Sequence, residues 1–239
     1  MRALITIVPQ SDADARLWRL TREVARLFSG LPWVLIGGQM VAILGAEHGL
    51  VAGRATVDVD ALLDVRAVSN ATIDAARLLQ EAEFAVRHEG DGLAYRFVRG
   101  GDIVDVLAPD HLGRHADLRT VPPDTTLEAL GGRQALDRRR LVRIDPGDGP
   151  FDVPVPSLVG AIVIKARVTD VSPQAEKHRR DLARLLALVK DAPACRAEVS
   201  RSERGYLRAR GELLDPRHPA WRGLAGSEDG AAALSILAE

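Results

Sequence analysis

The chain has 239 residues, of which 46% are hydrophobic and 27% are charged, and its formal net charge is −1. These values are average for a soluble globular protein and exclude a disordered, collagen-like or coiled-coil chain. The sequence has no run of about 18 apolar residues, which excludes an integral membrane protein, and its single cysteine excludes a multi-cysteine metal site. No small-residue cleavage site follows the short apolar run in MRALITIVPQSDADAR, so we expect a cytoplasmic protein.

The chain begins with alternating helix and strand signals. Ser11 is placed to cap an amphipathic helix that ends at Gly30. The short apolar run at 32–36 then predicts a buried strand, which the pair Gly37 and Gly38 ends. A second helix follows this pair.

Strict alternation of polar and apolar residues over Thr56–Asp60 predicts the next strand. Because residues two apart on a strand share a face, Asp58 and Asp60 are expected to project together while Val57 and Val59 face the core. This segment therefore presents two carboxylates to one side of a sheet.

The rest of the pattern divides the chain near residue 155. Ser69 is placed to cap a third helix. Further strands are predicted at 84–87, 94–98, 102–107 and, from weaker patterns, 141–144 and 151–155. From Pro156 onward the pattern is helical. We therefore expect an α+β fold, with a mixed β-sheet core and flanking helices in a domain over 1–155 and an all-helical domain over 156–239.

A third carboxylate, Asp105, lies within the strand predicted at 102–107. If that strand neighbours the one that carries Asp58 and Asp60, three carboxylates converge, and their repulsion requires cations. Carboxylate oxygens favour Mg²⁺ or Mn²⁺, and a pair of such ions is the usual device for displacement at phosphorus. The alternative is that Asp58 and Asp60 form the solvated face of an edge strand.

Residues before the acidic pair suit a phosphate group. Gly37 and Gly38 lie between a strand and a helix, where glycines let a ligand approach the backbone and the helix N-terminus offers free N–H groups. Arg54 and Thr56 are placed to contact phosphate or to orient the loop. The spacing predicts that a phosphate cradle and the metal ligands share one cleft.

The segments IGGQMVAILGAEHG, RATVDVDALLDV and DIVDVL resemble the nucleotidyltransferase superfamily with the polymerase-β-like fold. Within it, the chain looks most like bacterial AbiEii-type toxin nucleotidyltransferases, whose helical region carries a lysine followed by a lysine- and aspartate-containing helix. The matching residues are Lys165 in SLVGAIVIKARV, and Lys177 and Asp181 in EKHRRDLARLLAL. The spacing departs from the family pattern, and it leaves either Lys177 or Arg180 to act beside Asp181.

The resemblance implies a role for each matched residue. The acidic pair of the DVD segment would bind metal ions together with a nucleoside triphosphate. Asp105 would bind the catalytic metal and activate the acceptor hydroxyl. Lys165 would contact phosphates, and Lys177 and Asp181 would complete the nucleotide cleft. Lys177 and Asp181 are four residues apart, so a plain intrahelical ion pair is the alternative for them.

The resemblance further implies an enzyme that moves a nucleoside monophosphate from a nucleoside triphosphate to an acceptor hydroxyl. The acceptor it suggests is the 3′ end of tRNA, in a toxin with a cognate antitoxin protein. A small molecule such as an antibiotic is the rival acceptor, and a nucleotide- or RNA-binding protein without turnover is the alternative of another class. Arginine-rich segments at 131–143, 177–180 and 201–210 suit a phosphate-facing surface or solvated helix faces.

A zinc site is not expected. His111 and His115 are four residues apart, but they lack the intervening glutamate of the metalloprotease motif.

Overall fold

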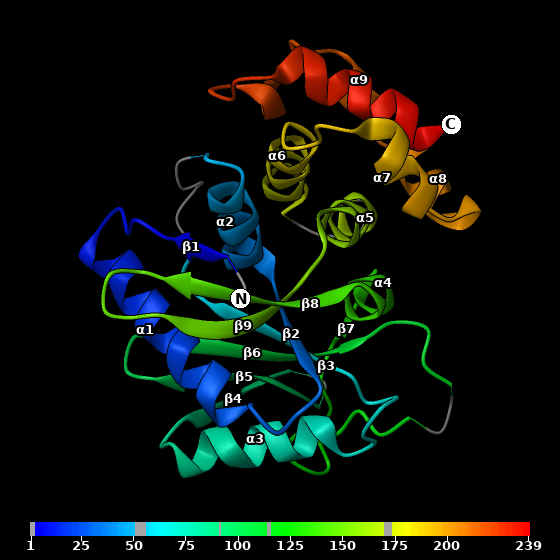
Figure 1. Ribbon diagram of the computed structural model, residues 1–239. Helices are drawn as coiled ribbons and strands as arrows, with labels where there is room; N and C mark the ends of the chain where they lie inside the picture. Colours follow the sequence, from blue (N-terminus) through cyan, green and yellow to red (C-terminus); the bar gives the residue numbers. More distant parts are fainter. Residues whose placement is uncertain (1–2, 51–55, 91, 114–115, 170–173) are drawn as a thin grey trace.

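A computed structural model describes residues 3–50, 56–90, 92–113, 116–169 and 174–239 (Figure 1). The strands are β1 (Leu4–Thr6), β2 (Trp33–Ile36), β3 (Val59–Leu63), β4 (Ala85–Glu89), β5 (Leu93–Arg99), β6 (Asp102–Pro109), β7 (Glu128–Ala129), β8 (Arg139–Asp145) and β9 (Phe151–Pro156). The helices are α1 (Asp12–Leu27), α2 (Gly37–Glu47), α3 (Ala71–Glu81), α4 (Gly132–Asp137), α5 (Leu158–Val168), α6 (Ala175–Leu186), α7 (Ala192–Glu198), α8 (Arg201–Arg208) and α9 (Ser227–Ala238), with short 3₁₀ turns at Gly211–Leu214 and Pro219–Trp221.

The strands form a mixed sheet and a smaller sheet beside it. In the described residues the larger sheet has the order β2-β3-β6-β5-β4, with β7 paired to β6. β3 and β6 run parallel, whereas β2 lies antiparallel to β3 and β5 lies antiparallel to both β4 and β6. The smaller sheet has the order β1-β8-β9, and β1 runs parallel to β8. This mixture of parallel and antiparallel pairs confirms the α+β class.

The larger sheet buries both of its faces. On β2, Leu35 belongs to the apolar cluster under α1 and α3, whereas Val34 and Ile36 belong to the cluster under α4, α5 and α6. Figure 1 shows α1 and α3 on the opposite side of the strands from α5 and α6. Ile36 pairs with Asp60, which in turn pairs with Asp105 on the next strand. Cross-strand partners share a face, so both carboxylates lie on the side covered by the later helices.

Local signals in the sequence account for several element boundaries. The Ser11 side chain accepts a hydrogen bond from the backbone N–H of Asp14 and so caps α1, as predicted. Ser157 caps α5 in the same way, through the N–H of Gly160. The three strands predicted over 84–107 are β4, β5 and β6, and the two weaker ones are β8 and β9.

Three expectations need correction. The strand predicted over Thr56–Asp60 begins only at Val59, and Val57 is 67% exposed rather than buried. The reason is that β2 ends at Ile36 and β6 pairs with β3 only from Val59 onward, so the preceding residues have no partner strand. The N-cap of α3 is Asn70 rather than Ser69. The third correction concerns helix boundaries: α1 ends at Leu27 rather than at Gly30, and α2 begins at Gly37 itself rather than after the glycine pair. The sequence predicted no strand at the position of β1.

The change to helices after β9 agrees with the predicted pattern, because the described residues beyond Pro156 form helices and turns. The cluster under α5 and α6 also draws on β2 and α2, so apolar contacts cross residue 155. The division into domains at that residue stays a prediction. Within the described part of the chain, no helix has the length and apolar character needed to cross a bilayer.

Candidate functional site

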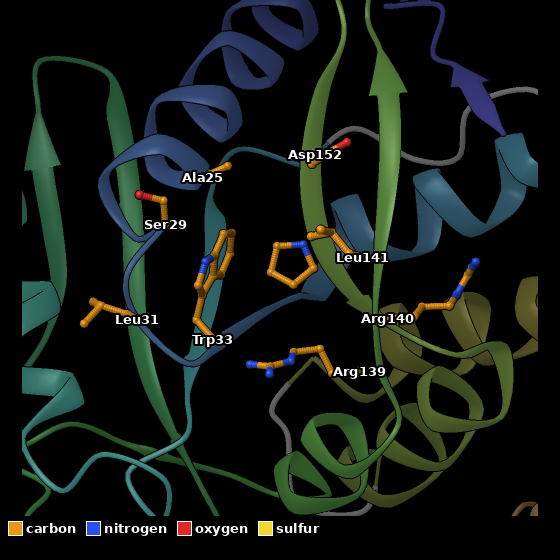
Figure 2. Close-up of a pocket in the computed structure, with 9 residues that line it drawn as sticks. Ala25, Ser29, Leu31, Trp33, Arg139, Arg140, Leu141 and Asp152 are labelled. Carbon is orange, nitrogen blue, oxygen red and sulfur yellow. The ribbon is translucent and has the colours of Figure 1, made fainter. Parts of the chain in front are cut away.

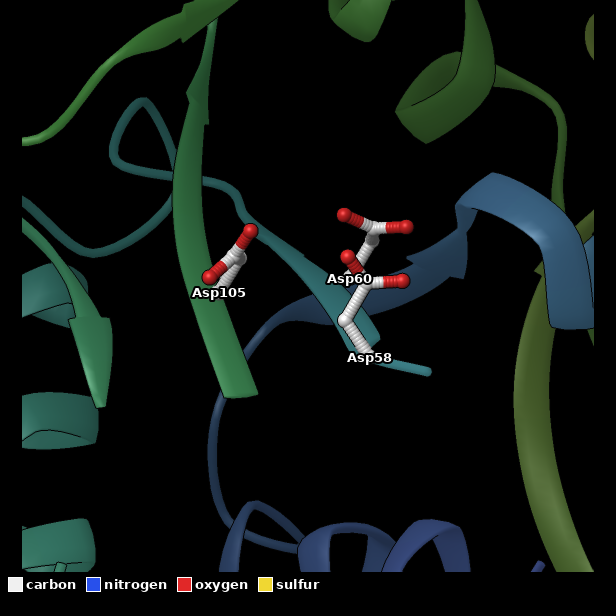
Figure 3. A group of neighbouring side chains, drawn as sticks. All are labelled: Asp58, Asp60 and Asp105. Atoms are coloured by element: carbon white, nitrogen blue, oxygen red, sulfur yellow. The ribbon is translucent and has the colours of Figure 1, made fainter. Parts of the chain in front are cut away.

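Three aspartates converge on the helix-covered face of the larger sheet. One carboxylate oxygen from each of Asp58, Asp60 and Asp105 lies within 4.8 Å of the others, and Figure 3 shows the three side chains facing a common space. Asp60 and Asp105 are direct partners on the parallel strands β3 and β6. Asp58 lies just before β3, where Thr56 Oγ1 donates a 3.0 Å hydrogen bond to Asp58 Oδ1. The predicted convergence is confirmed, and Thr56 contacts Asp58 in the segment that precedes β3.

The electrostatics of the cluster favour a bound cation. Burial and, to a smaller extent, the neighbouring charges of Asp58 and Asp105 raise the pKa of Asp60 to about 7, against the opposing effect of Lys165 and Lys177. Oxygen ligands of this kind suit a hard divalent ion such as Mg²⁺ or Mn²⁺. The donor set therefore fits the expected metal.

Gly37 has a structural role beside Asp60. It is the first residue of α2 and has a φ of +74°, a conformation that glycine adopts without strain. An ideal Cβ at this position would lie 1.7 Å from Asp60 Oδ2. Because Gly37 has no side chain, there is room for the Asp60 carboxylate. The sequence did not indicate this close approach between Gly37 and Asp60. Gly37 and Gly38 also line the same cleft as the aspartates, at the N-terminus of α2.

A buried ion pair joins α5 to α6 next to the carboxylates. Lys165 Nζ donates a 2.8 Å hydrogen bond to Asp181 Oδ2, and both side chains are almost fully buried. The structure thus supplies the partner that a buried lysine requires. Lys165 and Lys177 both line the cleft, whereas Arg180 is exposed and is absent from its lining.

The cleft that unites these residues has a volume of about 490 Å³, within the usual range for ligand sites. One wall carries the aspartates and the two glycines, and another carries Lys165 and Lys177. An apolar wall completes it, formed by residues that include Tyr95, Leu107, Leu127, Leu130 and Val168. His178 and Gln174 also line the cleft, and the sequence did not single them out.

Arg96 is the main site residue that the sequence analysis missed. Its guanidinium donates to both oxygens of Asp105, from Nε to Oδ1 at 2.8 Å and from Nη2 to Oδ2 at 2.6 Å. The two residues are direct partners on the antiparallel strands β5 and β6. A signal was present, because counting outward from the glycine pair of the RGG turn places these residues opposite each other.

Three further residues named from the sequence are Arg54, His111 and His115. Arg54 and His115 lie outside the described residues. His111 is an exposed residue beside Arg167 and Asp110, away from the aspartates' cleft. Among the residues described, the only cluster suited to a metal ion is that of the three aspartates.

A second hollow, of about 380 Å³, lies between the end of α1 and the β8–β9 hairpin (Figure 2). Trp33 lines it, and this side chain points to the face of β2 opposite the carboxylates. Of its lining residues only Asp152 carries a carboxylate. This hollow therefore lacks the donors that make the aspartate cleft the candidate site.

One comparison with known proteins, that with solved structures, bears on the fold. No protein-family model matches the sequence, and the comparison with curated proteins finds no match. A crystal structure described as an antigenic nucleotidyltransferase-like protein from Paracoccidioides brasiliensis is similar, with a TM-score of 0.53 and 18% sequence identity over 92% of each chain. This similarity confirms a nucleotidyltransferase-like fold for the chain. It does not single out AbiEii-type toxins.

Proposed function

We propose that the protein is a metal-dependent nucleotidyltransferase that moves a nucleoside monophosphate from a nucleoside triphosphate to an acceptor hydroxyl. The observation that carries the proposal is the convergence of Asp58, Asp60 and Asp105 at a cleft that also contains a helix N-terminus and two lysines. The nucleotidyltransferase-like fold supports it.

In this reaction the acceptor hydroxyl loses its proton to solvent and its oxygen forms a bond to the α-phosphorus. The bond from that phosphorus to the bridging oxygen of pyrophosphate breaks, and pyrophosphate leaves. Mg²⁺ or Mn²⁺, when bound, neutralises the charge that develops on the phosphate oxygens. Asp58 and Asp60 would hold the cation that accompanies the triphosphate, and Asp105 would hold the catalytic cation and orient the acceptor hydroxyl. The side chains would contribute mainly by positioning the triphosphate and the acceptor hydroxyl and by placing charged groups near the reacting phosphate.

The nucleotide is proposed to lie between α2 and the α5–α6 helices. Gly37 and Gly38 begin α2, whose N-cap makes no side-chain hydrogen bond, and a free helix N-terminus favours phosphate. Lys165 and Lys177 approach the same cleft from the other side. Lys165 is held by Asp181, and Lys177 lines the same cleft, so we propose both as phosphate contacts. Thr56 acts through Asp58, and Arg54 is proposed to contact phosphate from its loop.

For the acceptor we propose the 3′ end of tRNA, on the sequence resemblance alone, and with it a toxin role and a cognate antitoxin protein. The arginine-rich segments add little support, because Arg138 pairs with Glu203, Arg140 with Glu47 and Arg179 with Glu212. A small-molecule acceptor is the competing outcome. A cytoplasmic location stays a prediction.

Thermal unfolding tests the binding step without knowledge of the acceptor. With Mg²⁺ present, each nucleoside triphosphate would be added in turn to the wild type and to Asp60→Asn. We expect a rise in Tm for the wild type that requires both Mg²⁺ and nucleotide and that disappears in the variant. A rise that persists in Asp60→Asn without metal would instead indicate a nucleotide-binding protein without turnover.

A further inference from the structure

Arg96 lies beside the carboxylate cluster and lines the same cleft. It lies on β5, directly opposite Asp105, and both of its hydrogen bonds go to the Asp105 carboxylate. Its Nη2 is also 3.9 Å from Asp58 Oδ2. The side chain of Asp105 is only 7% exposed, so water competes little with this arginine.

The two hydrogen bonds from Arg96 hold the Asp105 carboxylate without using all of its oxygen lone pairs. A carboxylate offers about four lone-pair directions, and a two-pronged guanidinium occupies two of them. This bidentate contact also sets the plane of the Asp105 carboxylate, because two parallel hydrogen bonds restrict its rotation.

The same contact changes the charge balance of the cluster. Three carboxylates whose oxygens lie within 4.8 Å repel one another, and Arg96 places one positive charge directly against Asp105. The pKa of Arg96 is raised by its hydrogen bonds to Asp105, so the guanidinium keeps its charge. Arg96 therefore offsets the charge of Asp105 more closely than that of Asp58.

We propose that Arg96 is a positioning residue that acts through Asp105, fixing its carboxylate and supplying a resident positive charge that competes with divalent cations on that side of the cluster. The inference rests on the proposed metal-dependent function. It adds that metal loading at Asp105 occurs against Arg96, whose Nη2 lies 2.6 Å from Asp105 Oδ2 and 3.9 Å from Asp58 Oδ2.

Mn²⁺ binding to the full-length chain, measured by titration calorimetry and by electron paramagnetic resonance, tests the inference. Arg96→Met keeps a long side chain and removes the charge. We expect it to bind Mn²⁺ about tenfold more tightly than the wild type, since a unit charge a few ångströms away is removed from a partly buried site. Its Tm in EDTA should fall, and Mn²⁺ should restore it.

Arg99→Met is the matched control. Arg99 lies on the same strand and makes the same kind of double contact, to Glu23 at 2.8 and 2.6 Å, outside the cleft. This variant should lose stability but keep wild-type Mn²⁺ affinity. Arg96→Lys keeps the charge and loses the fork, so its Mn²⁺ affinity should stay close to wild type while kcat falls with little change in KM.

The outcomes separate the inference from the proposed function. If the wild type binds no Mn²⁺, the metal-dependent function itself is wrong. If the wild type binds Mn²⁺ and Arg96→Met binds it equally or more weakly, the proposal that the charge of Arg96 competes with divalent cations is overturned. If Arg96→Met does not fold, Arg96→Lys tests whether Arg96 positions Asp105. A kcat of Arg96→Lys equal to that of the wild type would overturn the positioning role.

Discussion

The carboxylate of Asp60 occupies the space that any side chain at Gly37 would need, since an ideal Cβ there would lie 1.7 Å from Asp60 Oδ2. The first residue of α2 and a carboxylate of β3 are thus in direct contact. This contact explains in steric terms why a glycine begins the helix. It also provides a sharp test of the site.

Gly37→Ala is expected to displace Asp60 and to lower the proposed transfer rate by about 100-fold or more, because a misplacement of about 1 Å can have that effect. The substitution also strains the backbone, given the φ of +74°. Gly49→Ala is the control, because Gly49 has a φ of +76° but no atom within 4 Å of its ideal Cβ. Equal losses of activity in both variants would contradict the steric account.

The pair of Lys165 and Asp181 should contribute strongly to stability as long as both members are present. Removing one partner of a buried ion pair leaves the other charge uncompensated, at a cost of about 3–5 kcal/mol. We expect Lys165→Met to lower the free energy of unfolding in urea by that amount, and Lys165→Met/Asp181→Leu to recover part of it. A single variant as stable as the wild type would contradict this reading.

Glu203 should make stability depend on acid pH. Hydrogen bonds from Arg138 and from the backbone N–H of Ser200 hold the pKa of this buried carboxyl below its usual value of 4.5, despite the opposing effect of burial. Its stabilising effect is therefore present above about pH 4.5 and is lost as the pH falls through the lowered pKa. The wild type should exceed Glu203→Gln by about 2–3 kcal/mol at pH 7.

The measurement is denaturant unfolding of both proteins between pH 7 and pH 3. The difference in their free energies of unfolding should narrow as the carboxyl becomes protonated. A difference that stays constant over this range would show that the ionised form of Glu203 is not the stabilising species.

The sequence allowed prediction of those parts of the site that depend on local periodicity. Alternation placed Asp60 and Asp105 on strands, and residues two apart on a strand were expected to present their carboxylates to one side of a sheet. The start of β3 at Val59 could not be predicted in this way, because it depends on where the neighbouring strands end. β1 pairs with β8 across more than 130 residues, a contact with no local signal.

Arg96 shows a different kind of omission. The RGG turn fixes the register of β5 and β6, so the pairing of Arg96 with Asp105 follows from counting along the hairpin. The contact between Lys165 and Asp181, in contrast, requires the packing of α5 against α6, which the sequence alone does not define.

Transfer of labelled nucleotide tests the central claim most directly. The wild type and Asp58→Ala/Asp60→Ala would each be incubated with Mg²⁺, total bacterial RNA and one α-³²P-labelled nucleoside triphosphate at a time. We predict that the wild type labels a tRNA-sized band with at least one nucleotide and that the variant labels none. RNA that stays unlabelled with all four nucleotides would contradict the proposed acceptor, and equal labelling by the variant would contradict catalysis by the aspartates.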